Sequence, residues 1–411
     1  MYPYKTFKTN RVKKISLLIV PLFLIAAVFL LQQGKLSDQT ATDGLICHGA
    51  RARSTPDEAV STIEGEAAAD QFLSTTTTAN IVDNGFGIAA GGNLVYWKQE
   101  DLNRFFQELT NLGVTWVRWD LDWKAIQPNN EQSYDWGGAD RVANTAKKYG
   151  IKSLGIITYA PQWAQEGSCP SGKQCPPENY ELFADFAGTV ARRYKGTIDN
   201  WEIWNEPNYR VYWYPVPDAY DYTELLKAAY TRIKEVNPDA VVVSAGLTDM
   251  GDEEGESISP LSFIETMYEE GAKDYFDILG LHPYTYPGYD YGWPQIKSVW
   301  KVMDENDDGE KKIWITEYGA PTGGSGRAFA IGEEGFMYGE DYMSEEAQSQ
   351  MAKSIFAFQA ENPNHIGNVF WYSLCDSSTD KSTTENFFGI LRYDGTRKLV
   401  YQTLKDIFSR K

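Results

Sequence analysis

The sequence predicts a (β/α)8 barrel. Short apolar or aromatic runs of strand type recur eight times between residue 80 and the end of the chain, and helix-like segments lie between them. The two most distinctive carboxylates, Glu206 and Glu317, each follow directly on such a run, where a strand should end. In a barrel of parallel strands, the carboxyl ends of all strands meet at one rim, and that rim carries the active site.

The expected strands and helices alternate. The expected strands are Asn84–Ile88, Val114–Trp119, Ser153–Thr158, Trp201–Trp204, Ala240–Ala245, Phe276–Leu281, Ile313–Thr316 and Asn368–Tyr372. The expected helices include Leu102–Leu112, Glu181–Tyr194, Thr223–Val236 and Glu345–Ala360. A doubly wound open sheet is the alternative, but it usually has fewer strands and a glycine-rich phosphate turn after its first strand. The glycines at 85, 87, 91 and 92 do not supply that turn.

The first 35 residues predict an export signal. An apolar run over residues 15–31, interrupted only by Ser16 and Pro21, follows a cluster of basic residues. Its length lies between that of a signal peptide and that of a spanning helix, and no small-residue cleavage site follows promptly. We expect a membrane anchor, with a cleaved and secreted form as the alternative. Either places the protein outside the cytoplasm.

Residues 36–79 are rich in Ser, Thr, Ala, Asp and Glu, a composition typical of a disordered spacer; a helix over Ser61–Leu73 is the alternative. The catalytic domain is therefore expected over residues 80–411. Beyond the basic N-terminus the chain has 32 basic and 57 acidic residues. Such a body repels nucleic acid and anionic lipid, so a neutral ligand fits best, and we expect a monomer that contacts the membrane through the N-terminal segment alone.

The cysteine spacing predicts one disulfide. Cys169 and Cys175 bracket a short turn-rich loop, which in an exported protein favours a local bridge and leaves Cys47 and Cys375 free or buried. With three His in the chain, a metal site lacks ligands. The run from Asp304 to Gly309 begins like a calcium loop, but Ile315 stands where the bidentate Glu is needed. We expect a solvated turn there, no metal and no cofactor.

Glu206 and Glu317 lie 111 positions apart, in Trp204-Asn205-Glu206-Pro207 and Trp314-Ile315-Thr316-Glu317-Tyr318-Gly319. Two carboxylates held across a cleft are the minimal machinery for cleaving a glycosidic bond. This pair of motifs, after the fourth and seventh strands, resembles the clan A glycoside hydrolases, which are retaining enzymes on (β/α)8 barrels. The resemblance extends from about residue 80 to the end of the chain. Within the clan, residues 159–163 and 281–284 are most similar to family 39 and to family 5-like members.

The resemblance implies a role for each of several residues. Glu206 would be the acid/base and Glu317 the nucleophile. Asn205 would bind the sugar 2-hydroxyl, and Arg118 would hold Glu317 ionised. The other residues expected at the substrate are His282, Tyr284, Trp371 and Trp213. Each has an ordinary structural alternative: Arg118 as a salt-bridge partner at the rim, His282 as a core histidine, and Trp371 as core packing.

Two aromatic clusters are expected to form the walls of the substrate cleft. Residues 209–214 hold three Tyr and one Trp, and residues 284–293 hold four Tyr and one Trp. Rings of this kind stack on sugars, so the clusters indicate an oligo- or polysaccharide; a self-packed lid is the alternative.

The function expected from these observations is retaining hydrolysis of an O-glycoside. A transglycosylase would use the same residues. A carbohydrate-binding pseudoenzyme would normally have lost one catalytic carboxylate, and this chain has both.

Overall fold

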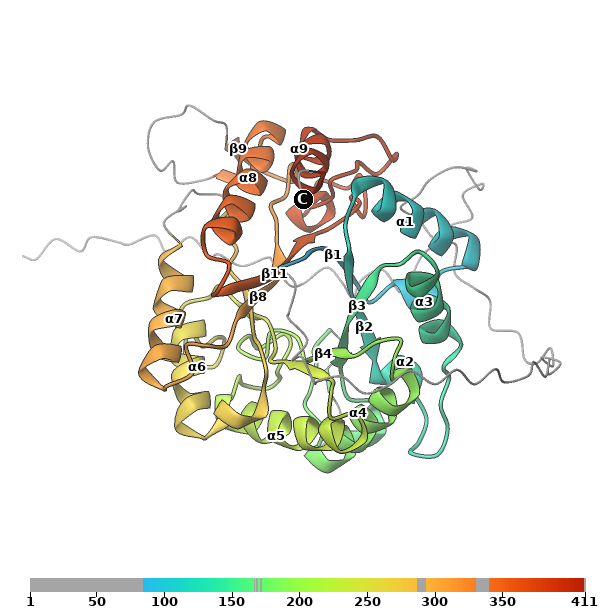
Figure 1. The fold of residues 1–411 in the computed structure, drawn as a ribbon, viewed down its shortest axis with the longest axis vertical. Coiled ribbons are helices and arrows are strands. Elements are labelled where there is room, and N and C mark those ends of the chain that lie inside the picture. Colours follow the sequence, from blue (N-terminus) through green and yellow to red (C-terminus); the bar gives the residue numbers. More distant parts are fainter. Residues whose placement is uncertain are drawn as a thin grey trace, which may run out of the picture.

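The computed structural model describes residues 84–409 apart from 166, 168, 171, 287–292 and 330–339. In that part of the chain, strands and helices alternate, and the helices form a ring around the strands (Figure 1). The predicted segments 1–35 and 36–79 lie outside the described residues. No helix within the described ranges is long and apolar enough to cross a bilayer.

The central sheet is parallel and has the order β5-β4-β3-β2-β1-β11-β8-β7-β6. Its strands are β1 (Phe86–Gly91), β2 (Trp116–Asp122), β3 (Lys152–Thr158), β4 (Asn200–Ile203), β5 (Val241–Val243), β6 (Leu247–Thr248), β7 (Leu279–His282), β8 (Ile313–Tyr318) and β11 (Ile366–Tyr372). β5 pairs with β4, and β6 pairs with β7. Because only three residues separate β5 from β6, they form one interrupted strand, and the sheet closes into eight positions. The predicted (β/α)8 barrel is confirmed.

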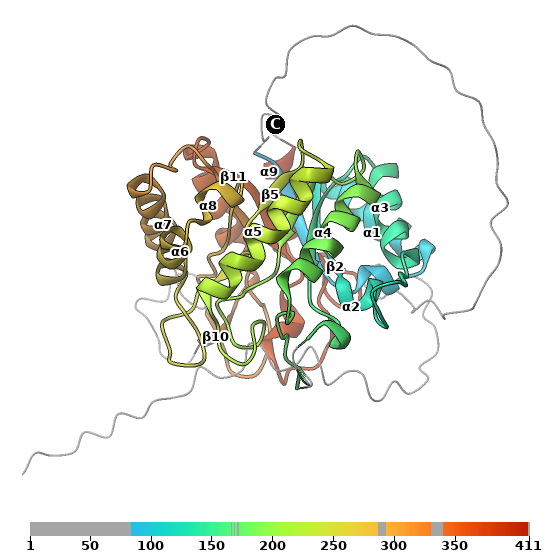
Figure 2. The same ribbon diagram turned by 90° about the horizontal axis from the view of Figure 1, so that it is seen from below.

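The surrounding helices are α1 (Gln99–Leu112), α2 (Trp123–Ile126), α3 (Gly137–Lys148), α4 (Tyr180–Tyr194), α5 (Ala219–Val236), α6 (Pro260–Glu269), α7 (Pro294–Glu305), α8 (Glu345–Glu361) and α9 (Leu399–Phe408). Several begin at a side chain that caps the free backbone N–H groups: Asn179 for α4, Asp218 for α5 and Ser344 for α8. In side view, α2 and a small sheet of β9 (Arg327–Phe329) and β10 (Glu340–Met343) lie at the end where the strands finish (Figure 2).

Alternation along the strands separates two apolar layers. One apolar cluster contains a residue from most of the strands around the barrel, including Trp116, Leu154, Trp314 and Phe370. It therefore fills the interior of the barrel. The larger cluster includes Val117 and the residues that follow it at alternate positions, and it packs between strands and helices. The side chains that share the face of Trp116 therefore point into the barrel, with Arg118 next along β2.

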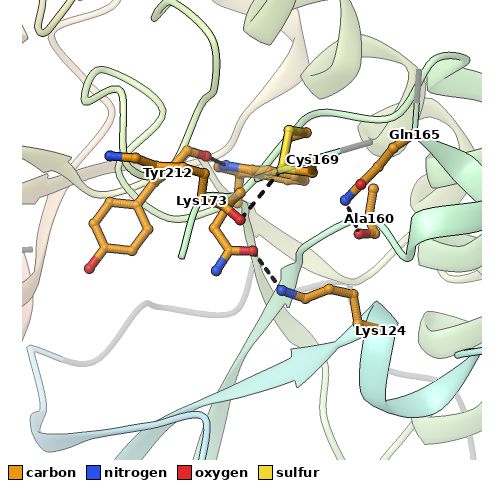
Figure 3. The surroundings of a disulfide bond; sticks show 9 residues. Lys124, Ala160, Gln165, Cys169, Lys173 and Tyr212 are labelled. Atoms are coloured by element: carbon orange, nitrogen blue, oxygen red, sulfur yellow. Dashed lines mark hydrogen bonds between the residues drawn. A yellow bond between two sulfur atoms is a disulfide. The ribbon is translucent and has the colours of Figure 1, made fainter. Parts of the chain in front are cut away.

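The predicted bridge between Cys169 and Cys175 is present, with the two Cα atoms 5.9 Å apart. The loop it closes contacts its neighbours on the rim (Figure 3). Lys124 donates to the Gln174 side chain, and the Gln174 backbone N–H donates to the Val211 carbonyl at 2.9 Å. The bridge thus supports the loop that follows β4. Cys375, predicted to be free or buried, is itself disulfide-bonded.

Replacing both Cys169 and Cys175 with serine is expected to lower the free energy of unfolding by about 2 kcal/mol, because the bridge constrains a short loop of the unfolded chain. Urea denaturation of the variant and the parent checks this. An unchanged midpoint would contradict it. A dithiothreitol titration of the parent should lower the midpoint by at least as much, since it also reduces the bond at Cys375.

The calcium-like run is a turn after α7 that is largely exposed, as predicted, but Asp308 within it is not solvated. Asp308 is buried and accepts a hydrogen bond from the Tyr268 hydroxyl at 2.8 Å, and Lys311 lies 3.1 Å from the same carboxylate. Both contacts hold the segment that leads into β8 in place.

Candidate active site

Arg118 is the centre of the site. It is buried, and its Nε and Nη2 lie 2.6 Å and 3.0 Å from the two carboxylate oxygens of Glu202 on β4. Nη1 donates to Glu317, and Nη2 also donates to the Asn205 side-chain oxygen at 2.8 Å. Burial opposes the guanidinium charge, but Glu202 and Glu317 outweigh that effect and raise the pKa of Arg118. The Arg118 guanidinium therefore positions Glu202 on β4, Asn205 just after β4 and Glu317 on β8.

An irregularity in β8 turns Glu317 inward. Val369 on β11 pairs with Ile315 on β8, and Trp371 pairs with Tyr318. Between these two pairs, β8 contains one residue more than β11. An extra residue of this kind bends a strand and changes the direction of its side chains, and such bulges are common beside active sites. Thr316 and Glu317 are consecutive, yet both reach partners inside the barrel, Thr316 at Glu202 and Glu317 at Arg118.

Glu206 lies in a strained turn after β4. Trp204 and Glu206 have φ values of 72° and 47°, in the left-handed region that residues with a side chain rarely adopt. Surrounding contacts hold this conformation: the Trp204 indole donates to the Tyr212 carbonyl at 2.8 Å, and the Glu206 backbone N–H donates to the Gly246 carbonyl at 3.1 Å. The turn places the Glu206 carboxyl inside the site, where it is buried.

Burial raises the pKa of Glu206 to about 7, against the opposing effects of Arg118 and a hydrogen bond from Thr248. The neighbouring carboxylate that contributes to this rise is Glu202. Glu206 can therefore stay protonated close to neutral pH, as a general acid requires.

His282 connects Glu206 to the ion pair of Arg118 and Glu202, so it is not an isolated core histidine. Its Nδ1 lies 2.9 Å from Glu206 Oε1, and its Nε2 lies 3.0 Å from the Thr316 hydroxyl. Burial lowers the pKa of His282 to about 4, so the ring is neutral and carries a single N–H.

The hydrogen bonds around His282 assign its tautomer. The Thr316 hydroxyl donates to Glu202 at 3.0 Å, so it accepts from His282 Nε2–H. Nδ1 is then an acceptor, and its bond to Glu206 is complete only when Glu206 carries a proton. The network thus favours the protonated form of Glu206, in the same direction as burial.

Glu317 faces a different environment. Arg118 and the Tyr284 hydroxyl, the latter at 2.9 Å, both donate to its carboxylate. These donors stabilise an ionised carboxylate, the form in which a nucleophile reacts. One carboxylate oxygen of Glu317 lies within 4.8 Å of one of Glu206. The two glutamates predicted from the sequence therefore face each other across one site, in contrasting surroundings.

Glu206, His282 and Glu317 also have ligand atoms close enough together to hold a metal ion. Their present partners fit a metal poorly. Arg118 is a fixed positive charge bonded directly to Glu317, and it would repel a second cation.

Raising the pH above about 7 is expected to lower kcat/KM progressively. Glu206 has a raised pKa, so its acidic form is present below that pH and is lost as the pH rises through it. The pH profile of kcat/KM with an aryl glycoside measures this. A flat profile between pH 6 and pH 9 would contradict the assignment of Glu206 as the acid.

Thr316→Val should shift the basic limb of the profile, which is the fall of kcat/KM at high pH, to lower pH. Without the hydroxyl, His282 is free to adopt the Nδ1–H tautomer, which donates to Glu206 and stabilises its ionised form. Thr316→Ser keeps the hydroxyl and is the control, with its limb in the wild-type position. A limb unmoved in the valine variant would show that the tautomer does not set the acid.

Two predicted substrate contacts are wrong. Trp371 is 0% exposed and packs edge-on against Tyr318, in the layer between strands and helices. Trp213 is 1% exposed and packs against Trp204 and Tyr222. Sequence alternation placed Trp371 on the inner face, but Tyr372 is the residue of that pair whose pKa is raised, by burial and then by nearby carboxylates that include Glu317.

The structure brings part of both aromatic clusters to the site, and their role as walls of a substrate cleft stays a prediction. Tyr212 and Tyr159 stack with ring centroids 6.3 Å apart, and Tyr286 packs against Phe388 at 5.3 Å. The described tyrosines of both clusters that lie near Glu206 are half-buried: Tyr209, Tyr212, Tyr284 and Tyr286. Tyr289 and Tyr291 lie outside the described residues.

Three residues of the site were not foreseen: Glu202, Thr316 and Glu385. Glu202 carried a signal, because an acid inside the apolar run of β4 must be paired when buried. Thr316 had none, since threonine is common in strands. Glu385 lies on a loop after β11 with no motif around it.

No family model matches the chain. A curated endo-1,4-β-xylanase of Gibberella zeae is 31% identical over 90 residues, which are 21% of this chain and 24% of the xylanase.

Solved structures align over far more of the chain. A family 39 glycoside hydrolase from Bacteroides cellulosilyticus superimposes with a TM-score of 0.61 at 24% identity, covering 80% of this chain and 64% of that one. A monomeric β-xylosidase from Caulobacter crescentus gives 0.60 at 14% identity, covering 79% and 68%. Xylanase 10B from Thermotoga petrophila gives 0.54 at 16% identity, covering 81% and 96%.

This chain has the glycoside hydrolase barrel fold. The predicted resemblance to clan A, with family 39 among the similar structures, is confirmed at the level of the fold. These superpositions cover 79% to 81% of the chain.

Proposed function

We propose that this protein is a retaining O-glycoside hydrolase that acts on an oligo- or polysaccharide by double displacement. The observation that carries the proposal is the pair of carboxyl groups within 4.8 Å of each other, one buried against a neutral histidine and the other held by Arg118. Retaining enzymes place their two carboxyl groups about 5–5.5 Å apart, whereas inverting enzymes leave room for a water between them.

In the first step, a Glu317 oxygen attacks the anomeric carbon and forms a carbon–oxygen bond. The bond to the leaving oxygen breaks, and that oxygen takes the proton of Glu206. In the second step, Glu206 removes a proton from water, the water oxygen bonds to the anomeric carbon, and Glu317 leaves as a carboxylate. The surroundings of the two residues suit the start of this sequence, because burial raises the pKa of Glu206 and both Arg118 and Tyr284 donate to Glu317.

Asn205 would bind the sugar at its 2-hydroxyl. Its side-chain oxygen accepts from Arg118, which directs its NH2 group away from that ion pair. A contact to the 2-hydroxyl strengthens at the transition state, so Arg118 would position both the nucleophile and this donor.

The substrate we propose is a neutral sugar chain. The acidic body of the protein and the carboxylates of the site disfavour acidic sugars. The xylanase and xylosidase names of similar proteins make β-xylosides and xylan the first substrates to test.

Proton NMR of the product released first from an aryl β-glycoside tests the mechanism. Initial formation of the β-anomer supports double displacement, and initial α-anomer would overturn it. Addition of a sugar acceptor separates the alternatives: a transglycosylase forms the longer glycoside in preference to free sugar. A pseudoenzyme would bind oligosaccharide without releasing any product.

We also propose that the enzyme works outside the cytoplasm, held to the membrane by residues 1–35 or secreted. The bridge between Cys169 and Cys175 supports this, because such bonds persist in oxidising compartments. Protease accessibility of the enzyme in intact source cells tests it, and full protection from added protease would contradict it.

A further inference from the structure

Besides Glu202, another carboxylate, that of Glu385, lies beside the catalytic pair and takes no part in the mechanism above. It belongs to η5 (Thr384–Phe387), a short 3-10 helix in the loop between β11 and α9. Three residues further on, Phe388 packs edge-on against Tyr284 with ring centroids 6.1 Å apart, and the Tyr284 hydroxyl donates to Glu317 at 2.9 Å. The loop that carries Glu385 therefore lies beside the catalytic pair. Burial, and then the charges of Glu206 and Glu317, raise the pKa of Glu385 to about 8.

The Glu385 side chain has an unpaired polar atom. Its Oε1 is shielded from solvent, yet it has no hydrogen-bond partner among the described residues. A buried carboxylate oxygen without a donor is costly, so such atoms are rare unless a ligand supplies the donor.

The surroundings of Glu385 are aromatic. Its charge acts on the hydroxyl groups of Tyr212, Tyr286 and Tyr372, which come from the loops after β4 and β7 and from the end of β11. Rings that flank a carboxylate are typical of sugar sites, because the rings cover apolar faces of the sugar while the carboxylate accepts from its hydroxyls.

The loop that carries Glu385 is held firmly. The Phe387 carbonyl accepts from the Thr322 backbone N–H at 3.0 Å and from the Lys398 ammonium at 2.9 Å. Phe388 packs against Tyr286 and Tyr372, both at 5.3 Å. A side chain on a loop fixed at this many points is positioned before substrate arrives, as recognition requires.

We propose that Glu385 is a substrate-binding residue that accepts hydrogen bonds from the hydroxyls at C3 or C4 of the sugar lying between Glu206 and Glu317. In the proposed mechanism the anomeric carbon meets Glu317 and the 2-hydroxyl meets Asn205, so the hydroxyls at C3 and C4 are the remaining donors attached directly to the ring. The inference rests on the proposed glycosidase function and extends it to the recognition of a particular edge of the sugar.

The test compares wild type with Glu385→Gln on the aryl glycoside that the wild type cleaves fastest and on its 2-, 3- and 4-deoxy analogues. For the wild type, removal of the hydroxyl that Glu385 binds should lower kcat/KM by about 10- to 100-fold. In the variant, the parent substrate should lose a similar factor, and the same deoxygenation should cost less than about threefold. Glu131→Gln, an equal change at an exposed loop position, is the matched control and should leave all values unchanged.

Equal 3-deoxy and 4-deoxy penalties in wild type and Glu385→Gln would overturn the inference while leaving the glycosidase function intact. The 2-deoxy penalty should be the same in both enzymes, since it reports Asn205. If the variant does not fold, the wild-type penalties still decide: less than threefold at both C3 and C4 would overturn the proposal. Absence of any glycoside turnover by the wild type would instead refute the proposed function, and this inference with it.

Discussion

Glu317→Gln is expected to lower kcat on an aryl glycoside by about 10⁴-fold or more, because the covalent intermediate cannot form without the carboxylate. KM should change far less, since Arg118, Asn205 and the aromatic walls remain. Steady-state kinetics with the most reactive aryl glycoside measures the loss. A loss below tenfold would exclude Glu317 as the nucleophile.

Glu317→Ala extends this test through chemical rescue. The shortened side chain leaves space at the anomeric carbon, so added azide should attack there once and give a glycosyl azide of inverted configuration. Glu131→Gln is again the control and should show neither the loss nor the azide product. A rescued azide of retained configuration would assign Glu317 to the other role.

Glu206→Gln is expected to have an effect that depends on the leaving group. A dinitrophenolate leaves without protonation, so its release should fall little. A sugar or alkyl leaving group needs the proton, so kcat/KM should fall by about 10²- to 10⁴-fold. The basic limb near pH 7 should disappear with the carboxyl group that causes it.

The matching rescue distinguishes the two glutamates. In Glu206→Ala, azide should intercept the glycosyl-enzyme and give a product of retained configuration, because Glu317 has already inverted the centre once. Equal losses for dinitrophenyl and alkyl glycosides would contradict the role of Glu206 as the acid.

Several features of this site could be predicted because they depend on local sequence. Period-two alternation and helical spacing gave the eight strand positions, and parallel strands necessarily bring their carboxyl ends together. From that point, Glu206 and Glu317 had to lie on one rim. Arg118 on β2 and Tyr284 after β7 were placed correctly for the same reason.

Other features depended on deviations from regular geometry. The bulge in β8 turns Glu317 toward Arg118, and nothing in the residues around it indicated an extra residue in that strand. The resemblance also favoured Trp371 as the ring at the site, whereas Tyr372 packs against the cluster inside the barrel and Trp371 packs outside it. Irregularities of one residue change which face a side chain occupies, so alternation fails where they occur.

The sequence by itself determined the barrel, the pair of glutamates and the disulfide, because each follows from spacing along the chain. Only the tertiary structure decided which partners surround each glutamate. The link from Glu202 through Thr316 and His282 to Glu206 joins three strand positions, those of β4, β7 and β8, and Glu385 reaches the site from a loop without a motif. Burial and hydrogen bonding at these partners arise only when distant segments pack together, and they place two chemically identical carboxyl groups in contrasting surroundings: burial favours the protonated form of Glu206, while Arg118 and Tyr284 donate to Glu317.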